Sequence, residues 1–181
     1  MVVAGMVDRR TDWRIAQMLK VAQVFRHPSF TERSALNDIA LLKLATPANF
    51  SARVSPVHLP RAGDFVQPRT PCVVTGYGYP NPKVKRTSIT LQQAPIPLLP
   101  LADCRRYWGP AITEDFICAG ASGVGLSKGD SGGPLVCLKD GAWTLACILS
   151  RGTLYSLTYK PFVCHRITSL LPWIQETMAN N

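Results

Sequence analysis

Short apolar segments alternate with turn-forming residues along most of the chain. The apolar segments are rich in valine, isoleucine, leucine and aromatic residues, which suit strands that pack against a core. Glycine, proline and asparagine lie between them, and these residues favour turns. The pattern predicts an all-β architecture, with its clearest strands at residues 21–25, 39–44, 72–75, 91–97, 133–137, 144–150 and 162–167.

The carboxyl-terminal segment has a different periodicity. Leu170, Ile174 and Met178 recur at a spacing of four, so they share one face of a helix. Pro172 suits the first turn of such a helix, and Thr168 is placed to cap it. We therefore predict one helix at the end of the chain.

The composition is that of a folded domain. Apolar residues make up 46% of the 181 residues and charged residues 17%, which permits a sizeable core. No apolar run is long enough to cross a membrane, so we expect no membrane span. The stretch from Met1 to Met6 is too short for the apolar region of a signal peptide. Export is therefore not expected to be encoded in this chain.

The chain carries a net charge of +9, with basic pairs at Arg9-Arg10 and Arg105-Arg106 and a basic loop at residues 83–86. Such a balance favours polyanions such as sulfated glycans, and nucleic acid much less. The charges are scattered and are not interleaved with exposed aromatic residues, so a solvated surface is the simpler interpretation. Polyanion binding is kept as an alternative function, and no nucleic-acid partner is expected.

The most specific chemistry lies at residues 129–134, with the sequence Gly-Asp-Ser-Gly-Gly-Pro. A serine hydroxyl such as that of Ser131 becomes a good nucleophile only when an imidazole accepts its proton and a carboxylate orients that imidazole. The flanking glycines allow a tight turn, in which the amides of Gly129 and Ser131 form an oxyanion hole. An ordinary surface turn is the alternative, because these residue types favour turns.

Further segments occur in a fixed order around this motif. Asp38 precedes the apolar run at residues 39–44 and is the natural carboxylate of a catalytic triad. The other segments are Pro-Cys-Val-Val-Thr-Gly-Tyr-Gly at 71–78, Asp-Phe-Ile-Cys-Ala-Gly at 115–120, Ser-Arg-Gly at 150–152 and Leu-Pro-Trp-Ile at 171–174. In this order they resemble the chymotrypsin family of serine proteases over essentially the whole chain. The phrases at residues 41–48 and 137–145 are similar to the pancreatic chymotrypsinogens in particular.

The resemblance implies a chymotrypsin-like double antiparallel β-barrel with the active site between the barrels. Residues 1–60 match only the later strands of the first barrel, so we expect that barrel to be incomplete. Residues 61–181 match the second barrel with its terminal helix. The family is extracellular and hydrolyses proteins or peptides without a cofactor, and we expect a monomer. An incomplete barrel exposes strand edges, so we expect protease-sensitive sites before Arg61.

The sequence departs from the family at the general base, which is a histidine in family members. Members carry it in an Ala-Ala-His-Cys segment upstream of the aspartate, and no such segment precedes Asp38 here. His27 lies 11 residues before Asp38 in a stretch similar to a surface turn, and His58 lies where chymotrypsins place a cysteine. His165 falls in a late apolar strand. We therefore expect Ser131 and Asp38 to lack a histidine partner in this chain.

The resemblance also assigns the substrate-binding positions. Gly125 takes the floor of the specificity pocket, so no acidic side chain is present there to select Lys or Arg. Phe162 stands where the family has a glycine on the pocket wall, and we expect its ring to fill the pocket. Arg151 replaces an aromatic residue. The full set is Gly125, Lys128, Ser150, Arg151, Gly152 and Phe162. We interpret these changes as drift rather than as a new specificity.

Six cysteines favour an oxidising compartment. The resemblance implies a bridge from Cys72 to Cys137 and another from Cys104 to Cys118. The family bridge beside the specificity pocket is missing, because Ser127 and Ser156 occupy its two positions.

Cys147 and Cys164 have no counterpart in the family pattern. They lie in successive apolar segments, so they either form a bridge across paired strands or remain two buried thiols. A metal site is not expected, because the cysteines lack the CxxC spacing and no histidine cluster accompanies them.

Together these observations predict a chymotrypsin-like serine endopeptidase homologue that is inactive in this form. Two alternatives remain. In one, a longer form supplies the histidine and is a working protease. In the other, the chain is a non-catalytic basic module that binds polyanions. The family also pairs a freed amino terminus with the aspartate before the serine, here Asp130, and we find no matching activation segment.

Overall fold

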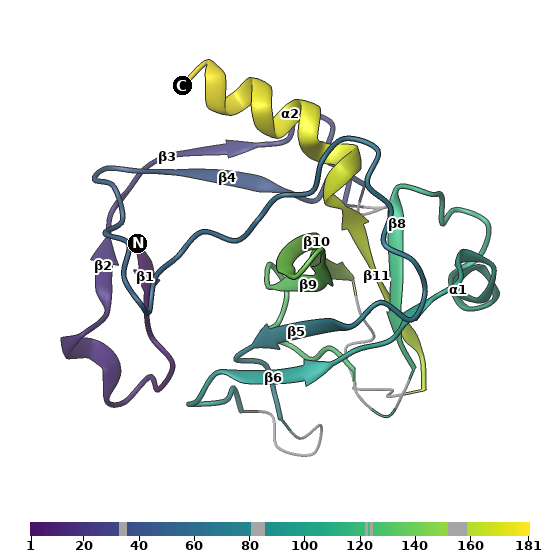
Figure 1. The fold of residues 1–181 in the computed structure, drawn as a ribbon, viewed down its shortest axis with the longest axis horizontal. Coiled ribbons are helices and arrows are strands. Elements are labelled where there is room, and N and C mark those ends of the chain that lie inside the picture. The colour runs from purple at the N-terminus through teal and green to yellow at the C-terminus, as the bar shows by residue number, and fades with distance from the viewer. Residues whose placement is uncertain (33–35, 81–85, 122, 124, 152–158) are drawn as a thin grey trace.

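The computed structural model describes residues 1–181 with the exception of 33–35, 81–85, 122, 124 and 152–158 (Figure 1). The elements of the amino-terminal part are β1 (Val2–Ala4), the 3₁₀ helix η1 (Asp12–Arg14), β2 (Gln17–Leu19), β3 (Val21–Arg26) and β4 (Ala40–Leu44). Those of the remainder are β5 (Cys72–Gly76), β6 (Gln92–Pro95), β7 (Leu98–Leu99), α1 (Leu101–Trp108), β8 (Phe116–Gly120), β9 (Pro134–Lys139), β10 (Ala142–Arg151), β11 (Pro161–Arg166) and α2 (Ile167–Ala179).

Strands β5 to β11 form a single antiparallel sheet in the order β6-β5-β9-β10-β11-β8-β7. Its two edge strands, β6 and β7, are separated in sequence only by residues 96–97. Because such a short link holds the two edges close together, the sheet must curl on itself, as Figure 1 shows. Ile96 of this link is buried in the main core with residues of the inner face, such as Leu135 and Leu149.

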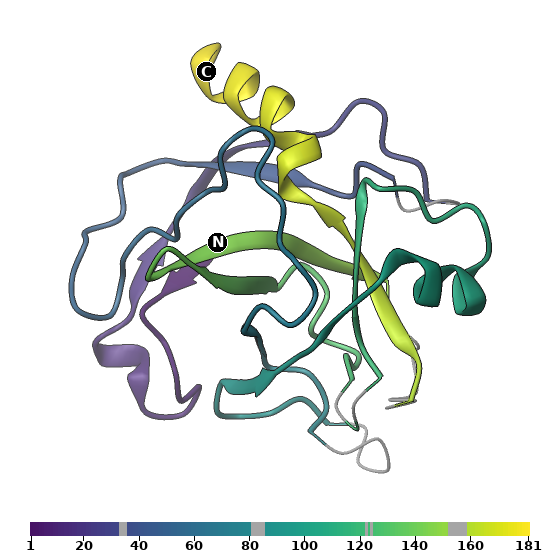
Figure 2. The same ribbon diagram turned by 45° about the vertical axis from the view of Figure 1, so that its right-hand side comes forward.

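The amino-terminal part forms two separate two-stranded sheets, β1 with β2 and β3 with β4. In Figures 1 and 2 these purple and blue strands lie on the left and upper sides of the curled sheet. Met18, Val24 and Leu42 on them are 45%, 50% and 49% exposed. Two-stranded sheets with exposed apolar residues lack the second layer that normally covers such a face. The predicted all-β architecture, with an incomplete first barrel, is confirmed.

Helix α2 confirms the predicted terminal helix and packs beside β10 and β11. Leu170 and Ile174 on it are buried in a cluster that also contains Ile39, so the end of the chain packs against the residue that follows Asp38. This contact lies between the amino-terminal part of the chain and the terminal helix. The division into residues 1–60 and 61–181 stays a prediction.

Three details of α2 differ from expectation. The helix begins one residue before Thr168, so Arg166 is the N-cap and no side chain caps this end. Pro172 lies inside the helix, beyond its first turn. Met178 is 66% exposed, because the last turn extends past the sheet that buries Ile174. Among the described residues, no helix has the length and apolar character needed to span a membrane.

Candidate active site

The candidate nucleophile loop is fixed against strand β10 by backbone hydrogen bonds. Gly132 N donates to Leu149 O at 2.7 Å, and Leu149 N donates to Gly133 O at 2.8 Å. Gly129 and Gly132 have φ angles of 103° and 83°, a left-handed region that favours glycine. Between these two glycines, Ser131 is exposed at the tip of the turn. The sequence therefore folds into a tight loop that presents one hydroxyl to solvent.

The amides of Gly129 and Ser131 were predicted to form an oxyanion hole. Among the described residues, neither amide donates a hydrogen bond to another group. Free donors beside an exposed hydroxyl suit an oxyanion hole, because such donors must be available to the negative charge of the tetrahedral intermediate. The assignment of this hole stays a prediction.

Asp130 lies under the loop, and its carboxylate has three partners within the chain. Gly78 N donates to Oδ1 at 2.8 Å, Ser127 N donates to Oδ2 at 2.9 Å, and Ser127 Oγ donates to Oδ2 at 3.0 Å. Asp130 N in turn donates to Ser127 O at 3.1 Å. These bonds satisfy both carboxylate oxygens and tie the loop to the segment that follows β5.

The glycines at 76 and 78 make room for this carboxylate. A Cβ atom at Gly76 would overlap Asp130 Oδ1, and one at Gly78 would overlap Asp130 Oδ2 and Ser127 Oγ. The sequence interpretation missed Ser127 as a partner of Asp130. The Gly-Tyr-Gly spacing was a usable signal, because two glycines one residue apart on a strand end mark a close approach of another group.

Asp38, the predicted triad carboxylate, lies half-buried just before β4. Ser150 Oγ on β10 donates to Asp38 Oδ2 at 2.5 Å. The preceding residue, Asn37, has a φ of 57°, and its amide donates to Nδ1 of His165 at 2.9 Å. The Asp38 carboxylate is therefore held by Ser150 of β10, and the backbone of the preceding residue is held by His165 of β11.

The three histidines have other contacts. His27 lies 4.9 Å from the ring of Trp173, and its Nδ1 accepts from Ser29 N at 3.2 Å. His58 is exposed, and its carbonyl accepts from Leu145 N. His165 is only 3% exposed, and burial lowers its pKa and thus favours the neutral ring. In the described part of the chain, no hydrogen bond joins any imidazole to Ser131 or Asp38.

The predicted substrate-binding residues are spread over different environments. Gly125 lines a cavity of about 220 Å³ that also reaches Asp130 and Ser127. Phe162 is 2% exposed and packs in the main core with Leu126 and Leu149. The remaining positions are Lys128, which is exposed, Ser150, which contacts Asp38, Arg151, whose side chain lies outside the described part, and Gly152, which lies outside the described residues.

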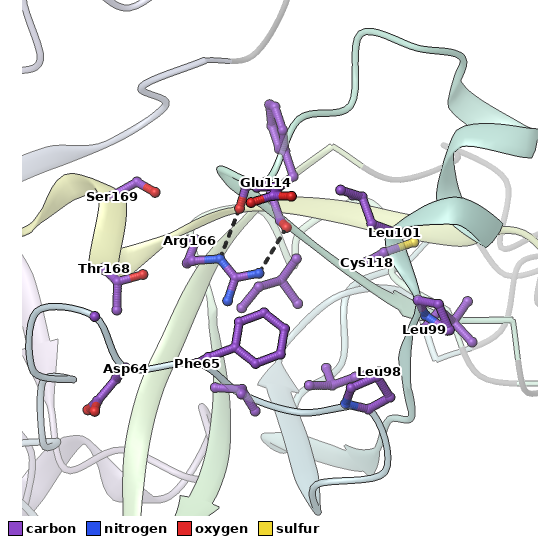
Figure 3. Close-up of a pocket in the computed structure, with 16 residues that line it drawn as sticks. Asp64, Phe65, Leu98, Leu99, Leu101, Glu114, Cys118, Arg166, Thr168 and Ser169 are labelled. Atoms are coloured by element: carbon purple, nitrogen blue, oxygen red, sulfur yellow. Dashed lines mark hydrogen bonds between the residues drawn. The ribbon is translucent and has the colours of Figure 1, made fainter.

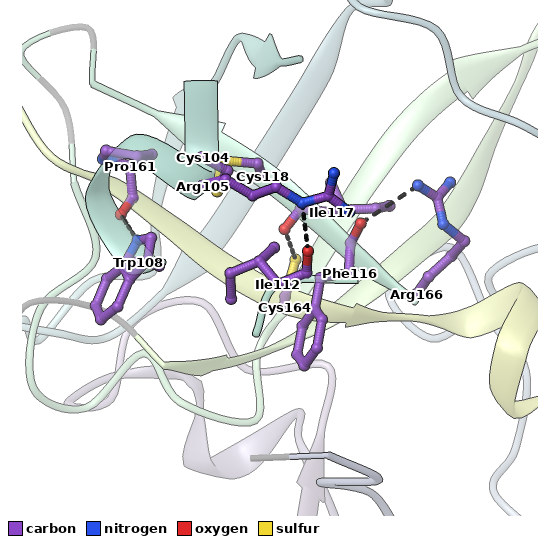
Figure 4. Close-up of a disulfide and its surroundings, with 10 residues drawn as sticks. All are labelled: Cys104, Arg105, Trp108, Ile112, Phe116, Ile117, Cys118, Pro161, Cys164 and Arg166. Carbon is purple, nitrogen blue, oxygen red and sulfur yellow. Dashed lines mark hydrogen bonds between the residues drawn. A yellow bond between two sulfur atoms is a disulfide. The ribbon is translucent and has the colours of Figure 1, made fainter. Parts of the chain in front are cut away.

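Three disulfides are present. The predicted bridges Cys72–Cys137 and Cys104–Cys118 are confirmed. Cys147 and Cys164 also form a bridge, which joins β10 to β11 and decides between the two alternatives left open by the sequence. Figure 4 shows the Cys104–Cys118 bridge between α1 and β8. Among the described residues, no group of three or more His, Cys, Asp or Glu side chains could hold a metal ion.

The basic pairs are partly neutralised by neighbouring acids. Arg10 forms an ion pair with Asp8 at 3.0 Å, and Arg106 forms one with Asp103 at 3.5 Å. The basic loop at 83–86 lies mostly outside the described residues. Polyanion binding stays a prediction.

Comparison with known proteins identifies a family and a relative of this chain. The sequence matches the family described as Trypsin over residues 1–174. It is similar to the human chymotrypsin-like elastase family member 3A, with 34% identity over 168 residues. This alignment covers 88% of the chain and 61% of the relative, so the chain spans less than two thirds of the relative's length. With its curled antiparallel sheet, its loop at Ser131 and this match, the chain belongs to the trypsin family of serine proteases.

Proposed function

We propose that these 181 residues carry the nucleophile and the orienting carboxylate of a chymotrypsin-like endopeptidase, and lack a proton acceptor among their own side chains. Ser131 is the nucleophile, Asp38 is the carboxylate, and the amides of Gly129 and Ser131 form the oxyanion hole. In this assignment the Ser131 hydroxyl attacks a peptide carbonyl carbon, an imidazole takes its proton, and the amine leaves with that proton as the acyl-enzyme forms.

The contact between Ser150 and Asp38 carries this proposal. A half-buried carboxylate fixed by a short hydrogen bond is suited to orient an imidazole. The exposed Ser131, between two glycines in left-handed conformations, is suited to reach a substrate. The imidazoles of His27 and His165 are engaged elsewhere, and among the described residues no hydrogen bond joins His58 to Ser131 or Asp38, which supports the absence of a base.

The effect of a missing histidine on the rate of peptide hydrolysis is known for the Ser-His-Asp triad of this family. Loss of any one triad member leaves about 10³ to 10⁴-fold acceleration over water. We therefore expect this chain alone to hydrolyse peptides at a very low rate. A full-strength protease would require a histidine from outside these residues.

The likeness to the pancreatic chymotrypsinogens extends the proposal to specificity. Without an acid at Gly125, the site has no charge to select Lys or Arg. The Phe162 ring lies in the core with Leu126 and Leu149, two residues that line the cavity at Gly125. We propose that the site has no preference for a basic residue at the cleavage site. Three disulfides support an extracellular location, because such bridges persist in oxidising compartments.

Chemical rescue tests the proposal directly. The chain is incubated with a chromogenic peptide anilide, with and without free imidazole, beside the Ser131→Ala and Asp38→Ala variants. We expect a slow rate that rises with imidazole concentration and disappears in Ser131→Ala. Asp38→Ala should lower the rescued rate but keep part of it, because free imidazole needs less orientation. A normal protease rate without imidazole would overturn the missing-base proposal, and a rescued rate unchanged in Ser131→Ala would overturn the nucleophile assignment.

A further inference from the structure

A second pocket lies away from the candidate active site and shares no residue with it. It has a volume of about 460 Å³ and lies between β8, the start of α1, the start of α2 and residues 63–68 (Figure 3). One part of its wall is apolar, and the other part bears a cation, two carboxylates and two hydroxyl groups. The apolar side chains are Phe65, Val66, Leu98, Leu99, Leu101 and Phe116, and the polar ones include Arg166, Thr168 and Ser169.

Arg166 is the cation of this pocket, and it is held in place by groups that do not neutralise it. Its Nε donates to Glu114 O at 3.1 Å, and one terminal nitrogen donates to Phe116 O at 3.4 Å (Figures 3 and 4). The guanidinium carbon lies 5.1 Å from the centre of the Phe65 ring. Backbone carbonyls and an aromatic face orient a guanidinium without forming an ion pair with it.

Two acidic residues, Asp64 and Glu114, line the pocket, but neither forms an ion pair with Arg166. Among the described residues, no carboxylate lies within 4.0 Å of the Arg166 nitrogens. Asp64 is engaged in an ion pair with Lys139 and accepts from Arg61 N at 2.7 Å. Glu114 and Asp115 are exposed and attract Arg166 only from a distance. Burial lowers the pKa of Arg166, because the charged form is poorly solvated there.

The start of α2 adds to the positive character of the pocket. The helix begins at Ile167, and no side chain caps its first turn. Thr168 and Ser169 of that turn also line the pocket. The partial positive charge of the helix start has the same sign as Arg166.

We propose that this pocket binds a small organic carboxylate with an apolar body. Its carboxylate would pair with the free edge of the Arg166 guanidinium, as planar carboxylates do. Its body would lie against the leucines and the Phe65 ring, where it leaves water (Figure 3). A sulfated glycan fits poorly, because it carries many charges and would meet one cation and an apolar wall.

Binding of two nearly isosteric probes tests the proposal. Phenylpropanoate and its neutral amide are titrated into the full chain, and amide chemical shifts are followed by NMR. We expect the carboxylate to bind at least about tenfold more tightly than the amide, the range for a hydrogen bond to a charged group. The shifts should be largest at residues 98–101 and 166–169. Equal binding of the two probes, or shifts confined to other residues, would overturn the proposal.

Three variants locate the charge that matters. Arg166→Met should remove the preference for the carboxylate over the amide, whereas Lys20→Met, which deletes an exposed cation outside the pocket, should leave it unchanged. Glu114→Gln removes a competing negative charge without changing the guanidinium, so it should tighten carboxylate binding about two- to threefold. Because Arg166→Met also removes two hydrogen bonds, Glu114→Gln is the decisive variant if Arg166→Met unfolds. Equal weakening by Lys20→Met and Arg166→Met would indicate a general charge effect and sink the assignment, as would unchanged binding in Glu114→Gln.

Discussion

The Ser150 hydroxyl donates a 2.5 Å hydrogen bond to Asp38 Oδ2, across 112 positions of sequence. Asp38 lies before β4 and Ser150 lies near the end of β10, so this bond joins an amino-terminal sheet to the curled sheet. The same two parts also meet where Ile39 packs against α2. A polar contact and an apolar contact at adjacent residues fix the position of the carboxylate.

Ser150→Ala should weaken the orientation of Asp38. A hydrogen bond to a charged group contributes about 1.5 to 3 kcal/mol, so its loss should lower the imidazole-rescued rate about tenfold or more. The rate is measured with the chromogenic anilide at several imidazole concentrations. Ser55→Ala, at an exposed serine, is the matched control and should leave the rate unchanged. An equal rate in Ser150→Ala and the native chain would refute the positioning role of Ser150.

Gly78→Ala should disrupt the loop that carries Ser131. Its Cβ would overlap the Asp130 carboxylate, and relieving such an overlap costs about 1 to 3 kcal/mol. The free energy of unfolding in urea measures this loss, and hydrogen exchange at residues 127–133 should rise. Gly141→Ala is the control, because its φ of 79° strains alanine while no atom lies within 4 Å of the new Cβ. A loss of stability no larger than that of Gly141→Ala, with unchanged hydrogen exchange at residues 127–133, would argue against close packing of Gly78 on the Asp130 carboxylate.

Stability should fall as the pH drops below about 6.5. Burial lowers the pKa of His165 below its ordinary value of 6.5, and it lowers the pKa of His27 in the same direction. Below that ordinary value the unfolded chain therefore binds more protons than the folded chain. The contribution is fully present above about pH 6.5 and is lost between that pH and the lowered pKa.

Urea unfolding at several pH values between about 5 and 7.5 checks this dependence. His165→Gln should flatten the slope in this range, and His27→Gln should flatten it less, because His165 is the more deeply buried. The carboxyl groups with lowered pKa values, such as that of Asp64, titrate at lower pH and do not contribute in this window. A slope that is unchanged in His165→Gln would contradict the assignment.

Removal of the Cys104–Cys118 bridge should destabilise the chain without changing its fold. A bridge that closes a loop of about 15 residues contributes about 3 kcal/mol through the entropy of the unfolded chain. The double variant Cys104→Ala/Cys118→Ala is compared with the oxidised native chain by urea unfolding. Trp108 Nε1 donates to Pro161 O at 2.9 Å and Arg105 Nε donates to Ile112 O at 2.8 Å, and these bonds should retain α1 (Figure 4). Loss of far-ultraviolet helix signal together with stability would show that the bridge is needed for the helix itself.

Limited proteolysis should cut first within residues 1–60. The two-stranded sheets there leave Met18, Val24 and Leu42 about half exposed, so local opening costs little buried surface. Mass spectrometry of early fragments identifies the sites. First cuts within described loops of the curled sheet, such as residues 61–71, with an intact amino-terminal part would contradict the expectation.

The sequence predicted strands well where apolar residues have turn residues on both sides. Strands β3, β4, β5, β9, β10 and β11 lie within a few residues of their predicted positions, as does α2. Strand β8 was missed, because all five of its residues are buried and show no alternation of polar and apolar positions. Helix α1 was missed because Cys104 is its one buried residue, so it carries little helical periodicity.

The candidate site residues were proposed from their motifs, and the motifs did not predict the partners that hold them. Ser131 and Asp38 belong to short segments of recognisable composition. The contacts of Asp38 with Ser150 and of Asn37 with His165 join positions more than a hundred residues apart, which only the folded sheet brings together. Asp130 was expected to need an ammonium partner, whereas the carboxylate is bound by Gly78 and Ser127. Ser127 stands where the family has a cysteine, and this substitution alone did not indicate that its hydroxyl bonds Asp130.

All three disulfides lie between Cys72 and Cys164. In denaturant under oxidising conditions, the polymer therefore has linear tails of residues 1–71 and 165–181 attached to a cross-linked, looped body. Such a body cannot swell to random-coil dimensions, whereas the two tails can expand freely. The protein should then migrate on non-reducing gels ahead of its reduced counterpart, and refolding from the oxidised state should start from a carboxyl-terminal half whose strand partners have never fully separated.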